Sequence, residues 1–412
     1  MSARNGLYPR PAVVSGHICL DVIPALRALE GDVASLLAPG KLVDVGAAVL
    51  STGGAVSNTG LALHRLGVPV RLAGKVGEDL FGRAILDILR GHGPGLADGM
   101  IVAAGEASSY TIVISPPGID RIFLHCPGAN DTFAAEDVPA GALREAGLFH
   151  FGYPPLMRRM YENGGAGLEA LLSAAKAAGA TVSLDMARPD PNSPSGRADW
   201  RAILARALPH VDLFLPSFEE ILFMLRRDKY EELSAAAGAS ADLLPFADEA
   251  LLSSLADEML SFGAAVAVIK LGEFGLYMKT SPSPRRIAAS GFYAPRDPAP
   301  WTGRELYVPC FRVEAAGTTG AGDCTIAGLL AGWMRGLAPE EALLGAVGVG
   351  ACCVERPDAV SGVRPWDDVQ RRIAAGWAQH PPKLAAFAAA EASGGARVWR
   401  SARDGERRET FS

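Results

Sequence analysis

Short apolar runs alternate with amphipathic segments over most of the chain, and this order constrains the fold more than any other feature. The runs that we interpret as strands are residues 11–15, 70–73, 148–151, 181–184, 211–215 and 265–269. Segments with helical periodicity follow or separate them, at residues 56–66, 80–89, 168–178, 218–225 and 251–262. Because strands that alternate with helices pair in parallel, the order predicts an α/β fold with a parallel sheet and helices on both faces.

Two early regions break this alternation. Residues 18–26 and 42–50 are strand-like and flank a polar loop, and residues 110–115 and 121–125 flank a Pro-Pro-Gly turn at 116–118. Such pairs do not fit crossover helices. They predict a small antiparallel sheet apart from the main one, suited to act as a lid.

Three stretches read as loops or insertions: residues 189–196, 228–247 and 280–309, the last crossing the surface. The tail from His380 is Ala-rich and then Arg-rich, and we expect it to fray or to pack on a neighbour. We therefore predict one large domain at 11–375, with lid strands within 17–50 and 100–126, and a C-terminal extension at 376–412.

Composition excludes several classes of protein. The 412 residues carry a net charge of −6 and no lysine-rich stripe, so a nucleic-acid partner is not expected. The 6 cysteines form no C-x-x-C pair, which favours reduced thiols and a cytoplasmic location over a zinc ribbon or disulfide framework. No apolar stretch approaches the ~20 residues that span a bilayer. The histidines are scattered, and a G-x-S-x-G elbow is absent, which disfavours a histidine metal site and an α/β-hydrolase.

The run GTTGAGD at residues 317–323 carries the strongest chemical signal. Ile326, Leu329, Leu330 and Trp333 follow it with helical spacing, so the small residues precede a helix N-terminus. Backbone N–H groups and the helix dipole at such a place bind anions. A carboxylate there, Asp323, is more useful as a base for an attacking hydroxyl than as an anion ligand. The run predicts a kinase of small hydroxylated molecules; the alternative is a plain Gly-rich turn.

A second Gly-rich segment opens the helix at residues 56–66. Gly53 and Gly54 let a ligand approach the backbone, and Asn58 can offer both a donor and an acceptor to sugar hydroxyls. The alternative is a helix entry with Asn58 exposed. The segment from Gly74 to Asp79 is not a P-loop, and we interpret it as a structural turn before a helix.

Two further segments follow predicted strands. Residues 270–275, KLGEFG, place glycines where ligands lie in open parallel sheets. Glu220 and Asp185 also follow strands, and carboxylates there can place water and magnesium near phosphates. A solvated helix start is the alternative for Glu220.

In this order and spacing, the motifs resemble those of the PfkB family, the ribokinase-like carbohydrate kinases, over residues 12–369. The first family signature matches Gly53, Gly54 and Asn58 and continues through residues 74–82, and the second matches residues 318–323. The resemblance implies a ribokinase-like, doubly wound, mostly parallel sheet flanked by helices, with a small β-sheet lid. It also implies ATP-dependent phosphorylation of a sugar or sugar-like hydroxyl, with Mg2+.

The resemblance assigns roles to individual residues. Asp323 would be the catalytic base, with anion-hole amides from Gly320, Ala321 and Gly322. The sugar would be bound by Asp21, Gly53, Gly54 and Asn58. Glu220 would serve the metal, and the nucleotide would be bound by Ser217, Lys270, Gly272, Gly275 and Thr318. A homodimer through the lid is the implied assembly.

Two departures from the family pattern matter. Gly317 stands where the family has Asp, so a monovalent cation near the anion hole is not expected, and Ser217 replaces Asn. These departures leave two alternatives open, a catalytically weak ligand-binding or regulatory protein on the same fold and a nucleoside kinase. A nicotinamide dehydrogenase is disfavoured, because Gly348-Val349-Gly350 lacks the third glycine of that fingerprint.

Overall fold

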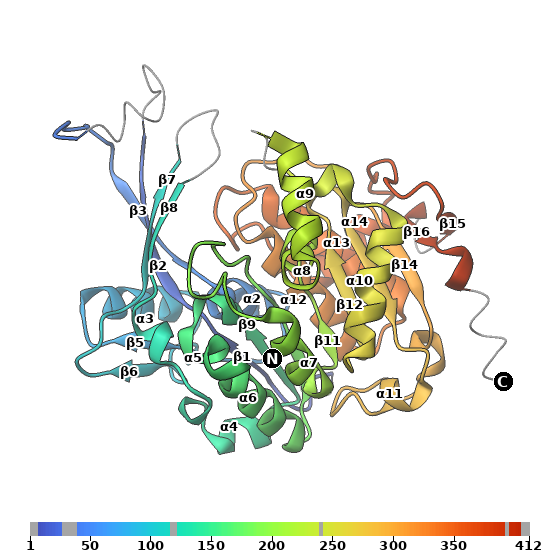
Figure 1. Ribbon diagram of the computed structural model, residues 1–412, viewed down its shortest axis with the longest axis horizontal. Coiled ribbons are helices and arrows are strands. Elements are labelled where there is room, and N and C mark those ends of the chain that lie inside the picture. Colours follow the sequence, from blue (N-terminus) through green and yellow to red (C-terminus); the bar gives the residue numbers. More distant parts are fainter. Residues whose placement is uncertain (1–6, 27–38, 116–121, 239–241, 392–394, 405–412) are drawn as a thin grey trace.

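A large, twisted sheet forms the centre of the computed structural model, which describes residues 7–26, 39–115, 122–238, 242–391 and 395–404 (Figure 1). Its strand order is β15-β16-β14-β13-β12-β11-β10-β9-β1-β4. Strands β4, β1, β9, β10, β11 and β12 pair in parallel, as the alternation predicts. Their bounds are Val70–Ala73, Ala12–Gly16, Leu148–Gly152, Thr181–Leu184, Leu213–Phe214 and Val266–Lys270.

Helices cover both faces of this sheet, which confirms the predicted architecture. One buried cluster packs under α2 (Ala55–Arg65), α3 (Leu80–His92), α12 (Ala321–Met334), α13 (Pro339–Val354) and α14 (Trp366–Ala374). The other packs under α4 (Ala140–Glu145), α6 (Ala166–Ala177), α7 (Trp200–Ala207), α8 (Phe218–Leu225) and α10 (Glu249–Ser261). Val13 and Val14 belong to different clusters, because successive side chains of a strand point to opposite faces.

The lid is a separate four-stranded sheet that stands away from the main body (Figure 1). Its strands are β3 (Ala48–Gly53), β2 (Cys19–Pro24), β7 (Tyr110–Ile114) and β8 (Ile122–Cys126), in that order. The prediction of an antiparallel sheet is wrong at its centre, where β2 and β7 pair in parallel. Each hairpin is antiparallel, but the two central strands run in the same direction. Residues 42–47 precede β3 instead of extending it, and the predicted turn at 116–118 lies outside the described residues.

Two predicted loops are regular structure. Residues 280–309 contain α11 (Pro284–Ala288) and β14 (Glu305–Val308), a buried strand that pairs with β13 (Leu276–Thr280). Polar residues interrupt the apolar pattern of these strands, so the sequence does not predict them. The Tyr277 hydroxyl donates to Glu305 at 2.7 Å inside the core. Residues 227–237 form the helix α9 (Arg227–Ala237), in which only Leu233 is fully buried, so its apolar periodicity is weak. The loop at 189–196 is confirmed.

The tail packs on the main sheet, so the expectation that it frays or packs on a neighbour is wrong for its described part. Strands β15 (Ala388–Glu391) and β16 (Arg397–Arg400) pair with each other, and β16 pairs with β14. The Arg-rich composition conceals β16, whose two central residues are buried and whose two ends are exposed. The division between a domain at 11–375 and an extension at 376–412 stays a prediction.

Candidate active site

The predicted base lies where α2, α12 and the end of β9 meet. Asp323, in the first turn of α12, is only 4% exposed. Its carboxylate accepts hydrogen bonds from Asn58 Nδ2 at 3.0 Å and from Thr59 Oγ1 at 3.4 Å, both on α2. The hydroxyl of Tyr153, after β9, lies 2.9 and 2.8 Å from the two carboxylate oxygens. Residues 265 positions apart in sequence, Asn58 and Asp323, are thus in direct contact.

Asn58 is 6% exposed, so the interpretation of an exposed helix entry is wrong. Its Oδ1 atom is buried and has no hydrogen-bond partner among the described residues. A buried, unpaired amide oxygen costs free energy unless a ligand donates to it. Asn58 thus donates to the Asp323 carboxylate with one end of its amide and keeps an unused acceptor at the other.

The Gly-rich run forms a tight turn into α12. Gly320 has φ of 72° at the N-cap, and a Cβ there would stand 2.7 Å from the carbonyl oxygen of Ala359, so a side chain is excluded. The Ala321 N–H donates to the carbonyl oxygen of Thr318 at 3.3 Å. The Gly322 N–H, in the first turn, has no acceptor within the helix, and such first-turn groups are those that bind anions. Lys270 lies alongside, because a Cβ on Gly322 would stand 3.9 Å from its Nζ.

Gly53 and Gly54, at the start of α2, lie against Asp21 and His17. A Cβ on Gly53 would stand 2.5 Å from Asp21 Oδ2. Gly54 has φ of 91°, and a Cβ there would stand 2.6 Å from His17 Nδ1. The close approach explains both glycines and brings Asp21, on the lid strand β2, to the entry of α2 that carries Asn58.

Asp185, Glu220 and Lys270 form a cluster of charged groups near the Asp323 carboxylate. Lys270 Nζ contacts Asp185 Oδ1 at 2.6 Å, and the other Asp185 oxygen is buried without a partner among the described residues. Burial raises the pKa of Asp185 to about 8, against the opposing effect of Lys270. Burial also raises the pKa of Glu220. For Lys270, burial acts to lower the pKa, but Asp185 and Glu220 outweigh it and hold the pKa above its usual value.

Ser217 and Glu220 form a reciprocal cap at the start of α8. Glu220 Oε2 accepts from the Ser217 N–H at 2.7 Å, and Ser217 Oγ accepts from the Glu220 N–H at 3.4 Å. The segment is therefore a helix start with a capping box. Glu220 is partly exposed there, and both Lys270 and Asp323 influence its pKa.

A cavity of about 490 Å³ adjoins the Gly-rich run at residues 317–323, and none of its lining residues belongs to the lid strands. Four of the five residues predicted to bind a nucleotide line it, namely Lys270, Gly272, Gly275 and Thr318, and Ser217 does not. Ala321 and Gly322 line the same cavity, so it opens onto the first-turn amides of α12. Its apolar walls include Phe311 and Val347, which suit a flat ring.

Sequence reasoning missed Tyr153 and His125, whose rings lie beside that of His17. His17 Nε2 lies 3.4 Å from His125 Nε2, and burial lowers the pKa of His17 to about 3, so the ring is neutral. Tyr153 has a left-handed backbone, with φ of 66° and ψ of 41°. Its place after a parallel strand could have marked it, since ligands gather at the carboxyl ends of such strands. The two histidines are distant in sequence, and no local pattern joins them.

Two other predicted segments have structural explanations. Asp79 caps α3 by accepting from the Gly82 N–H at 2.7 Å, as the structural interpretation of residues 74–79 expects. At Gly317, a Cβ would stand 2.9 Å from Pro357 Cα. The backbone of Pro357 thus fills the space that a larger residue at 317 would need.

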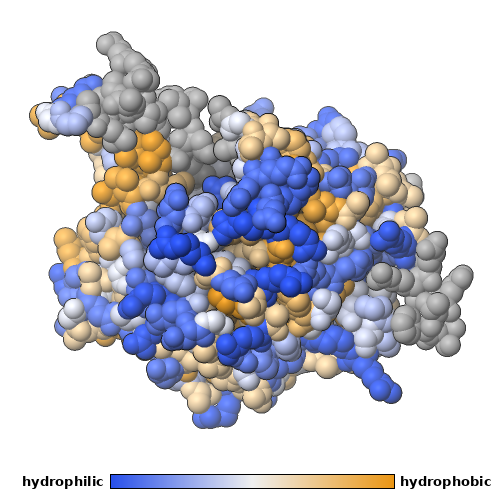
Figure 2. All heavy atoms as spheres, in the orientation of Figure 1, coloured by the Kyte–Doolittle hydropathy of each residue, from blue (hydrophilic) through white to orange (hydrophobic). Residues whose placement is uncertain are grey.

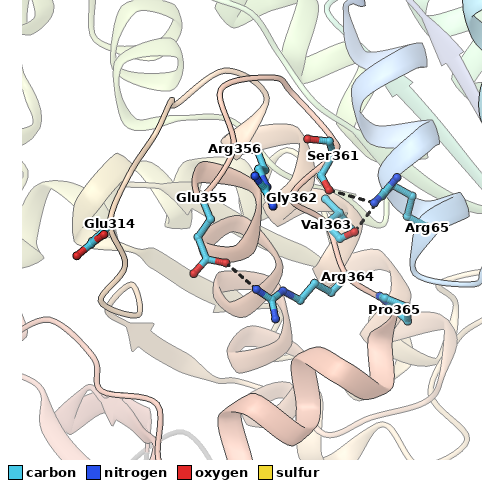
Figure 3. Close-up of a pocket in the computed structure, with 9 residues that line it drawn as sticks. All are labelled: Arg65, Glu314, Glu355, Arg356, Ser361, Gly362, Val363, Arg364 and Pro365. Atoms are coloured by element: carbon cyan, nitrogen blue, oxygen red, sulfur yellow. Dashed lines mark hydrogen bonds and ion pairs between the residues drawn. The ribbon is translucent and has the colours of Figure 1, made fainter.

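A second cavity of about 490 Å³ lies between α2 and the segment after α13 (Figure 3). Arg65 donates to the carbonyl oxygens of Val363 at 2.9 Å and Ser361 at 3.0 Å, and Arg364 pairs with Glu355 at 3.3 Å. None of the residues predicted for the site lines it. Its contacts fix α2 against the C-terminal helices, so we regard it as structural.

The residues that the structure describes contain no group of three or more His, Cys, Asp or Glu side chains arranged to hold a metal ion. Within the same ranges, every helix is too short or too polar to cross a membrane.

Known proteins share this fold and these motifs. The chain is 26% identical over 305 residues to an uncharacterized sugar kinase of Archaeoglobus fulgidus, covering 74% of this chain and 98% of the relative. The structure resembles that of an Arabidopsis thaliana ribokinase complexed with ribose and ATP, with a TM-score of 0.64, 18% identity, and 88% and 98% of the two chains covered. It also resembles an Escherichia coli protein solved in complex with ATP and Mg2+, with a TM-score of 0.61, 20% identity and the same coverage.

The model of the pfkB family of carbohydrate kinases matches residues 12–366, which include both Gly-rich motifs, the lid and the parallel sheet. The fold is ribokinase-like, as the two structural neighbours show. The chain therefore belongs to the pfkB family of carbohydrate kinases.

Proposed function

We propose that this kinase transfers the γ-phosphoryl group of ATP to a hydroxyl of a sugar or sugar-like molecule, with Asp323 as the base. The observation that carries the proposal is the position of Asp323. It accepts a hydrogen bond from Asn58, whose amide oxygen is buried without a partner among the described residues, and it lies in the first turn of α12, whose amides border the nucleotide-side cavity. This position supports a role for one carboxylate between an acceptor hydroxyl and the phosphates of ATP.

The transfer can be written in one step. The acceptor oxygen forms a bond to the γ-phosphorus while the bond from that phosphorus to the β–γ bridging oxygen breaks, and ADP leaves. The acceptor proton passes to Asp323. The amides of Gly320, Ala321 and Gly322 and the Lys270 ammonium stabilise the charge on the transferring group. Closure of the lid over the acceptor excludes water that would otherwise hydrolyse ATP.

The donors near Lys270 fit a magnesium ion held mainly by the nucleotide. Mg2+ in kinases binds one or two carboxylates together with phosphates and water. Glu220 supplies one carboxylate, and the unpartnered oxygen of Asp185 supplies a second donor. When bound, the ion offsets phosphate charge. A monovalent cation is not part of the proposal, because Gly317 has no side-chain ligand and Pro357 fills the space beside it.

The proposal is tested by replacing Asp323 with Asn, which keeps the size of the side chain and removes the base. We expect turnover to fall about 10²- to 10⁴-fold, the usual contribution of a positioned base. ADP release is measured with a panel of pentoses, hexoses and nucleosides. A D323N enzyme with full activity contradicts the assignment. Binding by the wild-type chain without turnover of any bound ligand favours the regulatory alternative, and turnover of nucleosides alone favours a nucleoside kinase.

We also propose that two copies associate through the lid. Apolar side chains gather on the lid strands (Figure 2). Val49 and Leu50 on β3 are 61% and 52% exposed, and Phe123 and Leu124 on β8 are 55% and 49% exposed. Both strands are edges of the lid sheet, and an edge strand can pair with a strand of another chain. A second lid would cover these side chains and pair the edges.

A further inference from the structure

Three groups can donate to the Asp323 carboxylate, which accepts about four hydrogen bonds. Asn58 donates to one oxygen and Thr59 to the other, and the Tyr153 hydroxyl lies 2.9 and 2.8 Å from both. An acceptor hydroxyl must reach one of these oxygens before its proton can be taken. The single Tyr153 proton, which is shared between both oxygens, then has to settle on the other one.

Of the three donors, Tyr153 can most readily release one oxygen of the Asp323 carboxylate. Asn58 is fixed on a buried helix, and its single bond reaches one oxygen. The phenol has one proton shared between two oxygens, so it can release one oxygen and keep a hydrogen bond to the other. Burial raises the pKa of Tyr153 well above its usual value, and Asp323 adds to this effect. The hydroxyl consequently remains a donor throughout the working pH range.

The backbone at Tyr153 supports a functional role. A left-handed conformation is rare for a bulky residue, and a residue before proline, here Pro154, ordinarily adopts an extended one. Such conformations are strained and persist where the surroundings fix them, typically at active sites. The ring packs near His17, with centroids 6.1 Å apart. The strained turn places the hydroxyl on the carboxylate of Asp323.

We propose that Tyr153 is a positioning residue, which holds the Asp323 carboxylate between α2 and the end of β9 and frees one of its oxygens for the acceptor hydroxyl. This inference rests on the proposed function of Asp323. The other charged groups around the carboxylate are Lys270 on β12, Glu220 on α8 and Asp185 after β10. Within the described part of the chain, none of these three donates a hydrogen bond to Asp323. Asn58 and Thr59 each donate to a single oxygen, so Tyr153 is the donor that reaches both.

The test is Tyr153→Phe, which keeps the ring and the backbone and removes only the hydroxyl. We expect kcat to fall roughly 10- to 100-fold, the effect of one lost hydrogen bond to a charged group, while KM for the acceptor does not rise. The acidic limb of the pH–rate profile moves to higher pH, because the ionised carboxylate has lost a donor. Tyr161→Phe is the matched control, since this partly buried tyrosine has no recorded contact with Asp323, and it keeps wild-type kinetics.

The outcomes separate this inference from the proposed function. A Y153F enzyme with wild-type kcat, KM and pH profile overturns the positioning role, whereas an inactive wild-type enzyme across the panel overturns the proposed function. A loss of kcat in Y153F with an unchanged pH profile and a lowered melting temperature also contradicts the inference, because it indicates a purely structural role.

Discussion

A single buried histidine makes the stability of this protein depend on pH. His150 is fully buried on β9 and bonds Ser183 Oγ through Nδ1 at 3.0 Å. Burial, with a smaller contribution from Lys270, lowers its pKa to about 3. The unfolded chain restores a pKa near 6.5. A histidine that stays neutral in the fold and protonates on unfolding makes stability depend on pH.

Stability falls as pH decreases, because the unfolded state takes up a proton at His150. Between pH 6.5 and pH 3 the unfolded state binds a proton at His150 that the folded state does not, so stability is full above pH 6.5 and falls as pH decreases. We expect His150→Asn to reduce this slope by up to about 1.4 kcal/mol per pH unit. Urea unfolding at pH 7, 6, 5 and 4.5 measures it. The exposed His380→Asn variant is the control, and equal slopes in all three proteins would refute the prediction.

At the scale of elements, the lid differs from the main sheet in what covers it. Helices bury both faces of the main sheet, while the lid exposes Leu50 and Phe123 on its two edge strands. Exposed apolar edges are sites of association between chains. The parallel pairing of β2 with β7 joins two hairpins that are distant in sequence, and it leaves β3 and β8 as the edges.

We expect Leu50→Lys and Phe123→Lys to convert a dimer into monomers, because a charge buried at a lid interface without a partner costs several kcal/mol. Analytical ultracentrifugation over a range of concentrations measures the change. Leu80→Lys is the matched control, because Leu80 is 69% exposed on α3, outside the lid. A wild-type chain that sediments as a monomer, or lid variants that remain dimeric, rules out this interface.

On the scale of the whole molecule, the C-terminal segment is fastened to the main sheet by a buried ion-pair network. Arg304, next to β14, is 1% exposed and contacts Asp404 at 2.8 Å and Glu340 at 2.5 Å. Asp404 also accepts from the Glu305 N–H at 3.0 Å. Residues about a hundred positions apart thus satisfy one buried guanidinium.

Removal of one partner from such a pair leaves a buried charge unpaired. We expect Asp404→Ala to lower the free energy of unfolding by about 3–5 kcal/mol. The neighbouring Arg403→Ala is the control, since Arg403 is exposed, and it should change stability by no more than about 0.5 kcal/mol. Urea denaturation of the full-length chain measures both, and an Asp404→Ala midpoint equal to that of the wild type would disprove the role of this network.

Local periodicity was sufficient for the parallel strands and their helices, because each such element shows its buried face in consecutive residues. It failed for β14 and β16, whose polar side chains have partners in remote segments: Glu305 of β14 accepts from Tyr277, and Arg400 of β16 donates to Glu340. The candidate site divides in the same way. Asp323 and Asn58 stand in recognisable motifs, whereas Tyr153 shows its role only beside the carboxylate.

The sequence by itself determined the family, the parallel sheet and the two Gly-rich motifs, because glycines and helix starts are local requirements of backbone geometry. Only the tertiary structure decided how those motifs meet. It placed Asp323 against Asn58 and Tyr153, joined the lid hairpins in parallel, and made the Arg-rich tail an edge of the main sheet. The physical reason is that contacts between distant residues depend on the packing of whole elements, which local periodicity does not specify.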